Sequence, residues 1–177
     1  ITEMTLEGNN LLEGGAGANL SEYVAPTNCD IEVNFGANDY NAISAAVDNA
    51  SSGDVICVGT GNYSSSWESN NGSGYPIIVD TEDVTIAGVN NPEENDAAKV
   101  SITDASTNEA FLVTADDVTI QGLYVTGAGT TFTGNQLAGI QISPSTVSDD
   151  VDGVTIAYNV IEEFKTIDPG ASAKGIQ

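Results

Sequence analysis

Short apolar segments separated by polar turns run through most of this chain, and one segment recurs. Asp-Val-Thr-Ile stands at residues 83–86 and 117–120, and Gly-Val-Thr-Ile stands at 153–156. A looser copy, Asp-Val-Ile-Cys, stands at 54–57, so that the four copies start 29, 34 and 36 residues apart. A strand-sized unit that returns at such intervals indicates a solenoid, in which each unit buries its apolar face against the next.

Two further series of apolar segments accompany the repeat. One comprises residues 76–79, 111–113, 139–142 and 175–177, and the other comprises 123–125 and 160–161. Together with the repeat they predict three short strands per turn, with Val and Ile of the repeat inward, Thr outward and equivalent residues stacked about 4.8 Å apart. This pattern describes an all-β fold, the parallel β-helix. A β-sandwich is the alternative, because it too consists of short strands between turns.

The first part of the chain differs from the repeats. Residues 1–30 are polar and glycine-bearing and predict a loosely structured N-terminal arm, with one strand near residues 4–6. Residues 31–177 form the predicted β-helix domain, which opens with a half-buried strand at 31–35. A helix follows, in which Ile43 and Val47 share one face, Asp39 is the expected N-cap and Gly53 the expected left-handed C-cap. Such a helix would cover the open apolar end of the strands after it.

The stretch from Asn41 to Tyr63 consists of this helix, a Gly-Asp turn, the apolar strand Val-Ile-Cys-Val and then Gly-x-Gly-Asn-Tyr. It resembles the opening of the right-handed parallel β-helix proteins of the pectin-lyase-like superfamily, and the Asp-Val-Thr-Ile segments resemble their coil repeats. Over residues 39–177 the resemblance implies a right-handed parallel β-helix with an N-terminal capping α-helix. The superfamily includes polysaccharide lyases, glycoside hydrolases, phage tailspikes, adhesins and surface proteins, so the fold alone implies no activity.

The charge balance is strongly acidic. The 177 residues include 26 Asp and Glu but only 3 Lys or Arg and no His, for a net charge of -23. Such a surface lacks the cations that bind nucleic acid or anionic membranes. It also repels itself, and molar salt screens that repulsion by shortening the Debye length to about 3 Å. The composition therefore predicts a halophile protein; a calcium-loaded extracellular protein and an ordinary acidic secreted protein are the alternatives.

Two cysteines, Cys29 and Cys57, flank the predicted helix. A disulfide between them would stabilise the fold by roughly 3 to 4 kcal/mol in the chain-entropy model. The alternative is a pair of buried free thiols. We expect the disulfide, and with it a secreted or cell-surface location. No stretch of about 18 consecutive apolar residues is present, so no membrane span is predicted.

The sequence offers little catalytic chemistry. Lyases of the resembled families use an Arg or Lys base, but this chain has no Arg, and both Lys99 and Lys165 are expected to be ordinary surface charges. A glycoside hydrolase needs carboxylates that converge across a groove. The acidic residues here precede the repeats instead, and Asp83 and Asp117 occupy the same repeat position, which indicates a role in the turn. We therefore expect no catalytic residues.

Binding candidates remain. Calcium prefers carboxylate and carbonyl oxygens, although neither EF-hand nor β-roll spacing is present. Its candidate ligands are Asp116, Asp117, Asp149, Asp150 and Asp152. Trp67 and Tyr75, in a Ser/Asn-rich segment, are candidates to stack on a sugar ring; the alternative is that they fold back over the edge of the coil. Asparagine glycosylation sequons begin at Asn19, Asn49, Asn62 and Asn71.

The last residues, 174–177, match the start of the earlier strand at 138–141, so a new coil is expected to begin there with no capping helix after it. An uncapped coil exposes unpaired backbone groups. Another copy, or an exchanged N-terminal arm that adds a strand, would cover them. The predicted function is therefore an extracellular structural subunit of a surface layer, sheath or filament that binds copies of itself. The alternatives are a carbohydrate-binding or carbohydrate-cleaving β-helix and a viral fibre segment.

Overall fold

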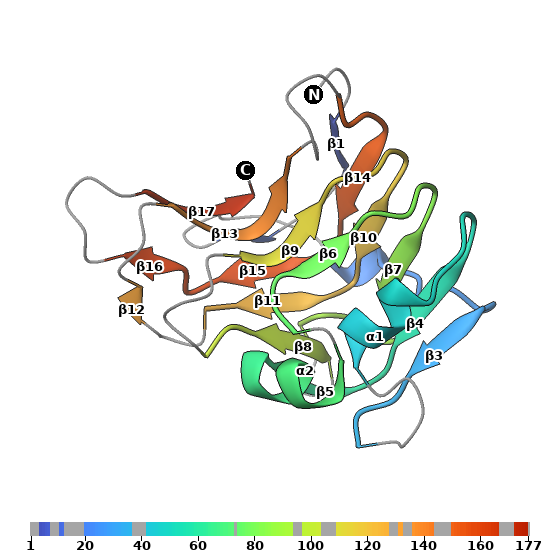
Figure 1. Ribbon diagram of the computed structural model, residues 1–177, viewed down its shortest axis with the longest axis horizontal. Helices are drawn as coiled ribbons and strands as arrows, with labels where there is room; N and C mark the ends of the chain where they lie inside the picture. The colour runs from blue at the N-terminus through green and yellow to red at the C-terminus, as the bar shows by residue number, and fades with distance from the viewer. Residues whose placement is uncertain are drawn as a thin grey trace.

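The computed structural model of this chain consists mainly of short parallel strands in three sheets (Figure 1). The residues that the structure describes are 4–7, 11–12, 20–36, 42–72, 74–93, 97–103, 109–127, 131–132, 136–143, 150–166 and 172–176. Every strand pair within these residues is parallel. The fold is therefore all-β in its main part, with few helices.

Each sheet collects one of the three series of strands. Sheet A holds, in spatial order, β1 (Met4–Glu7), β14 (Val154–Ala157), β10 (Thr119–Gln121), β7 (Thr85–Gly88), β4 (Val55–Val58) and β3 (Ile31–Val33). Sheet B holds β2 (Leu11–Leu12), β15 (Val160–Glu162), β11 (Tyr124–Thr126), β8 (Ala98–Ser101) and β5 (Gly61–Ser64). Sheet C holds β17 (Ser172–Ile176), β13 (Gln136–Ile142), β9 (Glu109–Val113) and β6 (Ile77–Val79). A small fourth sheet pairs β12 (Thr131–Phe132) with β16 (Lys165–Thr166).

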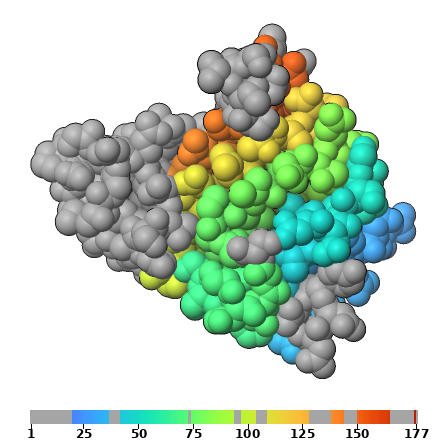
Figure 2. Space-filling model, in the orientation of Figure 1, coloured from blue at the N-terminus to red at the C-terminus, as the bar shows by residue number. Residues whose placement is uncertain are grey.

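The chain visits the three large sheets in a constant order. From β6 to β15 it passes through sheets C, A and B three times, and it then enters sheet C again at β17. In Figure 2 the coloured segments accordingly lie as adjacent bands, from cyan through green and yellow to orange. The predicted grouping of the strands into three series, one for each large sheet, is confirmed.

Stacked apolar side chains fill the space between the sheets. In sheet A, Ile56, Ile86, Ile120 and Ile156 occupy the same register position on four neighbouring strands, and all four are fully buried. The Thr residues of the repeat form the adjacent column and are only partly buried. Val and Ile of the repeat therefore face the core and Thr faces outward, as the sequence predicts. Burial of each such side chain contributes about 1.5 to 3 kcal/mol.

The looser copy of the repeat pairs one residue away from the predicted alignment. Val55 pairs with Thr85 and Cys57 with Ala87, whereas alignment on Asp-Val would have paired Cys57 with Ile86. The reason is that stacking of Ile56 on Ile86 buries both side chains. Because side chains alternate across a strand, a shift of one residue reverses the faces, and Cys57 lies on the side of sheet A away from the isoleucine column.

The first helix is shorter than predicted. It spans α1 (Ile43–Asp48), with Ala42 as N-cap and Asn49 as C-cap, so the expected caps Asp39 and Gly53 are wrong; Asp39 itself lies outside the described residues. Gly53 instead lies inside the turn before β4, with a φ of 90°. The helix buries Ile43, Ala46 and Val47 and packs against β6, β3 and β4, so it covers the end of the sheets as expected.

A second helix, α2 (Ser65–Asn71), lies where the sequence predicts only strands. The hydroxyl of Ser64 accepts a hydrogen bond from the backbone N–H of Trp67 at 3.2 Å and caps the helix. Its Ser and Asn residues have low helix propensity, so the composition conceals it. Both helices lie at the end of the sheets opposite the two chain termini (Figure 1). Among the described residues, no helix is long and apolar enough to cross a membrane.

Candidate functional site

The N-terminal strands lie far from the strand that follows them in the chain. β1 pairs with β14 and β2 pairs with β15, whereas β3 lies at the opposite edge of sheet A. The strand predicted near residues 4–6 is therefore present. It extends sheet A beyond the last copy of the repeat, with Thr5 in register with Thr155.

The strands from the two ends of the chain share one end of the molecule. β1 is the outermost strand of sheet A, β2 that of sheet B and β17 that of sheet C. Figure 1 accordingly shows the N- and C-termini on the same side, away from α1 and α2. The described part of the arm thus pairs with the edges of β14 and β15 that would otherwise be open, at the place where the sequence predicts a new coil.

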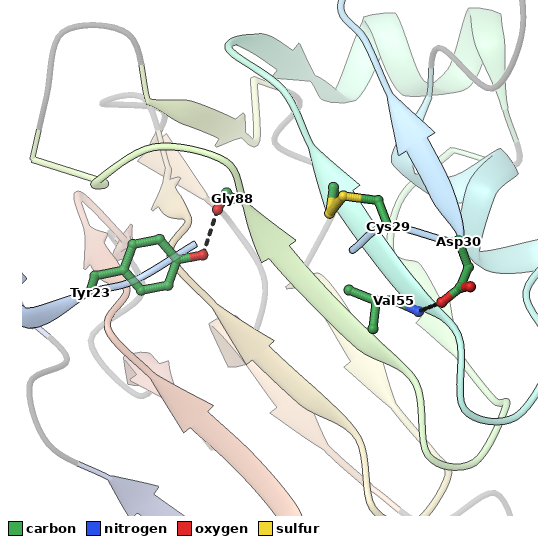
Figure 3. The surroundings of a disulfide bond; sticks show 6 residues. Tyr23, Cys29, Asp30, Val55 and Gly88 are labelled. Carbon is green, nitrogen blue, oxygen red and sulfur yellow. Dashed lines mark hydrogen bonds between the residues drawn. A yellow bond between two sulfur atoms is a disulfide. The ribbon is translucent and has the colours of Figure 1, made fainter. Parts of the chain in front are cut away.

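Between β2 and β3 the arm passes along sheet A. A short 3-10 helix, η1 (Leu20–Glu22), buries Leu20 completely, and the carbonyl of Leu20 accepts a hydrogen bond from the side-chain amide of Asn91 at 3.0 Å. The hydroxyl of Tyr23 donates a hydrogen bond of 2.5 Å to the carbonyl of Gly88 (Figure 3). Burial raises the pKa of Tyr23, so this hydroxyl stays a neutral donor.

The residues that end the second and third copies of the repeat contact the Tyr23 ring. Gly122 has a φ of 66°, and a Cβ atom there would lie 2.2 Å from Cζ of Tyr23. The equivalent residue in the third copy is Tyr158, with a φ of 54°, and its ring packs on that of Tyr23 with 5.8 Å between centroids. A non-glycine residue at position 122 would collide with the docked arm.

A disulfide fixes the arm at its other end. Cys29 is bonded to Cys57 of β4, and the neighbouring Asp30 accepts a hydrogen bond from the backbone N–H of Val55 at 2.9 Å (Figure 3). The one-residue register described above directs Cys57 to the outer side of the sheet, where it meets Cys29 and is buried. Beside the disulfide lies a hollow of about 190 Å³ lined by Cys29, Glu32, Asn34, Cys57, Gly59 and Val89.

The acidic candidates for calcium act in the turns before the repeat. The carboxylate of Asp116 accepts a hydrogen bond from the backbone N–H of Asp152 at 2.8 Å, and the N–H of Asp117 donates to the carbonyl of Asp152 at 2.9 Å. Asp83 and Asp117 have φ values of 58° and 56°. In the described part of the chain no group of three or more metal-ligating side chains is assembled; Asp150 is exposed there and Asp149 lies outside it. Calcium binding stays a prediction.

The two aromatic candidates for glycan stacking both fold back onto the protein. The ring of Trp67 packs on Phe35, with 4.5 Å between centroids. The hydroxyl of Tyr75 donates to the carbonyl of Tyr63 at 2.8 Å, and both Trp67 and Tyr75 pack against the hydrophobic core. Phe35 is 44% exposed and is the aromatic face that this cluster presents to solvent. These contacts match the packing alternative that the sequence left open.

Three of the sequon asparagines lie in the described residues, and Asn19 does not. Asn49 and Asn62 are exposed and Asn71 is partly buried. Asn49 and Asn71 each donate a hydrogen bond to a backbone carbonyl within their helix, and Asn62 accepts one from the hydroxyl of Ser101 at 2.5 Å. Glycosylation at these positions stays a prediction.

One buried carboxylate, that of Glu68, was not predicted from the sequence. Glu68 of α2 is inaccessible to solvent and accepts hydrogen bonds from the backbone N–H groups of Ile43 and Ser44 and from the hydroxyl of Ser44. Its oxygens are thus directed at the start of α1. Lys99, by contrast, lies over the ring of Tyr124 at 4.9 Å, an ordinary surface contact.

Comparisons of the chain with protein-family models, with curated proteins and with solved structures give no match.

Proposed function

We propose that this chain is an extracellular structural subunit, a right-handed parallel β-helix of the pectin-lyase-like type, that assembles with copies of itself into a filament, sheath or surface layer. The observation that carries the proposal is the completion of sheets A and B by β1 and β2. The edges of β14 and β15 accept added parallel strands, and backbone pairing of this kind also joins separate chains.

The proposed extracellular location of the protein rests on two properties of the chain. The disulfide between Cys29 and Cys57 is typical of proteins outside the reducing cytosol. The net charge of -23 suits a protein that works in high salt, where screening removes the repulsion between neighbouring subunits.

The two ends of the sheets differ in how they can bind a neighbour. At one end α1 packs over β3, β4 and β6, so the sheets cannot continue there directly into another copy. At the other end the outermost strands of sheets A and B come from the N-terminal arm. Of the two predicted routes of assembly, the arm is therefore better supported than direct stacking of coil ends.

The structural role is favoured over catalysis by what the acidic residues do. Asp116, Asp117 and Asp152 take part in backbone hydrogen bonds of adjacent turns. Glu68 bonds the start of α1. The carboxylates of Asp116 and Glu68, which accept these backbone N–H groups, are not placed as an acid and base pair across a groove.

Negative-stain electron microscopy of the purified chain in molar potassium chloride tests the proposal, with calcium added to one sample and a chelator to another. Long regular polymers in either sample are the expected result, and polymers only with calcium would also assign calcium a role in assembly. Monodisperse monomers or closed trimers in both samples, at all protein concentrations, would overturn the proposal.

A further inference from the structure

The N-terminal arm has one covalent attachment and several non-covalent ones. The chain contains two cysteines, so the bond between Cys29 and Cys57 is its single disulfide, and residues 1–28 lie beyond it. Tyr23 and Leu20 dock this segment on sheet A through buried surface and hydrogen bonds. β1 and β2 attach by backbone pairing to β14 and β15. The whole segment before Cys29 can therefore detach without breaking a covalent bond.

We propose that the arm is exchanged between copies: β1 and β2 of one chain pair with β14 and β15 of the next, in the register that they adopt within one chain. This proposal rests on the proposed function and specifies its contact. Tyr23 and Leu20 act as a latch that holds the arm on its own chain, and release of the latch makes β1 and β2 available to a neighbour. The partner is a second copy of this chain.

The length of the arm permits this exchange. Within one chain, the arm returns from β3 to β1 across the width of the six-stranded sheet A, about 24 Å at the usual strand spacing. If the α1 end of one copy faces the β14 end of the next, the arm needs to cross only the helix layer, about 10 Å thick. The segment from residue 13 to residue 28 reaches about 50 Å when extended. The path to a neighbour is thus shorter than the path within the chain.

The chemistry of the contact suits a highly charged protein. β1 and β2 bind through main-chain hydrogen bonds, which need no complementary side-chain charge. The acidic flanks repel other copies in dilute salt, so exchange is expected to increase as salt screens them. Each copy donates one arm and accepts one arm, and such a head-to-tail contact extends into a filament when it does not close.

Cysteine cross-linking tests the exchange directly. Thr5 and Thr155 are paired in register, which brings Cα atoms to about 4.8 Å and within disulfide range. A Thr5→Cys chain and a Thr155→Cys chain are mixed unfolded, refolded together in molar salt and oxidised. A covalent heterodimer, with the new disulfide located by peptide mapping, is the expected result. A mixture that stays monomeric, while the double variant Thr5→Cys/Thr155→Cys closes within one chain, would overturn the exchange.

Two controls make the result specific. Glu7→Cys pairs with position 157 rather than 155, so its mixture with Thr155→Cys should give little heterodimer. Tyr23→Ala, which removes the Tyr23 half of the latch, should raise the heterodimer yield about tenfold, the effect of a lost hydrogen bond and a partly buried ring. An unchanged or lower yield would contradict the role of Tyr23 as a latch.

The outcome separates the exchange from the proposed function. The full-length double variant Thr5→Cys/Thr155→Cys, oxidised as a monomer so that its arm is locked on its own chain, should form no polymers by electron microscopy if the arm joins the subunits. Polymers of this locked chain, together with no heterodimer from the cysteine mixture, would overturn the exchange and leave a structural subunit that assembles by another surface. Heterodimers without polymers from the full chain would support the exchange and overturn the filament.

Discussion

Ser44 donates both its backbone N–H, at 2.9 Å, and its hydroxyl, at 2.7 Å, to one carboxylate oxygen of Glu68. The other oxygen accepts the N–H of Ile43 at 3.0 Å. These N–H groups begin α1, and helices leave such groups without an internal partner. The carboxylate from α2 therefore replaces the missing N-cap side chain and joins the two helices at the covered end of the sheets.

Removal of this carboxylate should destabilise the protein. In Glu68→Ala, two buried N–H groups and the Ser44 hydroxyl lose their acceptor, and we expect a loss of about 2 to 4 kcal/mol in the free energy of unfolding. Denaturant unfolding in molar salt measures it. The exposed Glu82→Ala removes the same charge and should change stability by less than about 0.5 kcal/mol. An equal effect of both variants would contradict the capping role.

The same carboxylate should contribute a specific pH dependence. Burial raises the pKa of Glu68, although the hydrogen bonds from Ser44 and Ile43 oppose the rise. A raised pKa in the folded state means that the fold is favoured while the group is protonated and loses stability as the pH rises. Glu68→Gln keeps one acceptor oxygen but cannot ionise. Its stability relative to the native protein should therefore rise with pH above about 4.5, by up to about 1.4 kcal/mol per pH unit, until the pH passes the folded-state pKa of Glu68.

Thermal unfolding of both proteins between pH 4 and pH 8 measures this difference. Comparison with Glu82→Gln cancels the loss of one charge from a very acidic surface. If the stability difference between Glu68→Gln and the native protein does not change over this range, Glu68 does not titrate with a raised pKa.

The strand series and their stacking could be predicted because they depend on local pattern. Val and Ile recur at equivalent places, so the columns at Ile86, Ile120 and Ile156 follow directly from the repeats. The alignment of residues 54–57 was wrong by one residue, because the Asp-Val pair is a weaker guide than the burial of Ile56. Packing, and not sequence identity, decides register at a divergent copy.

The remaining errors concern contacts between distant residues. The cap of α1 comes from Glu68, 24 residues beyond Ser44 in the chain, and no local sequence pattern predicts this contact. β1 pairs with β14 of its own chain although all of the repeats separate them, whereas the sequence offered an exchanged arm as one way to cover that edge. The docking of Tyr23 depends on space above Gly122, which becomes visible only when the sheet is assembled.

The central isoleucine column should dominate stability. Ile120 is fully buried between Ile86 and Ile156, and Ile120→Ala should lower the free energy of unfolding by about 2 to 5 kcal/mol through lost burial and a cavity. Thr119→Ala, on the outer side of the same strand, should cost less than about 1 kcal/mol. Denaturant unfolding of both variants at one salt concentration measures the contrast. Similar losses would contradict the assignment of the two faces.

Salt should stabilise this protein through screening. With a net charge of -23, the folded state repels itself, and the Debye length falls from about 30 Å at 0.01 M to about 3 Å at 1 M. The melting temperature should therefore rise with potassium chloride, most steeply below about 0.5 M. Sorbitol at matched osmolality is the control and should not reproduce that steep part. A purely linear rise up to several molar would indicate a salt effect on burial instead of screening.

The docking of Tyr23 should depend on the absence of a side chain at position 122. Gly122→Ala strains a φ of 66° and places a Cβ 2.2 Å from Cζ of Tyr23, so the arm should lift from sheet A. Hydrogen exchange of residues 20–23 reports the loss of docking.

Gly36→Ala is the matched control, because Gly36 has a φ of 79° but no atom within 4 Å of the added Cβ. It carries the backbone strain alone and should leave the exchange of residues 20–23 unchanged. In the background of Tyr23→Ala, Gly122→Ala should cost less than it does alone, since the collision is gone. If the two Gly→Ala variants expose the arm equally, strain and not the contact with Tyr23 explains the effect.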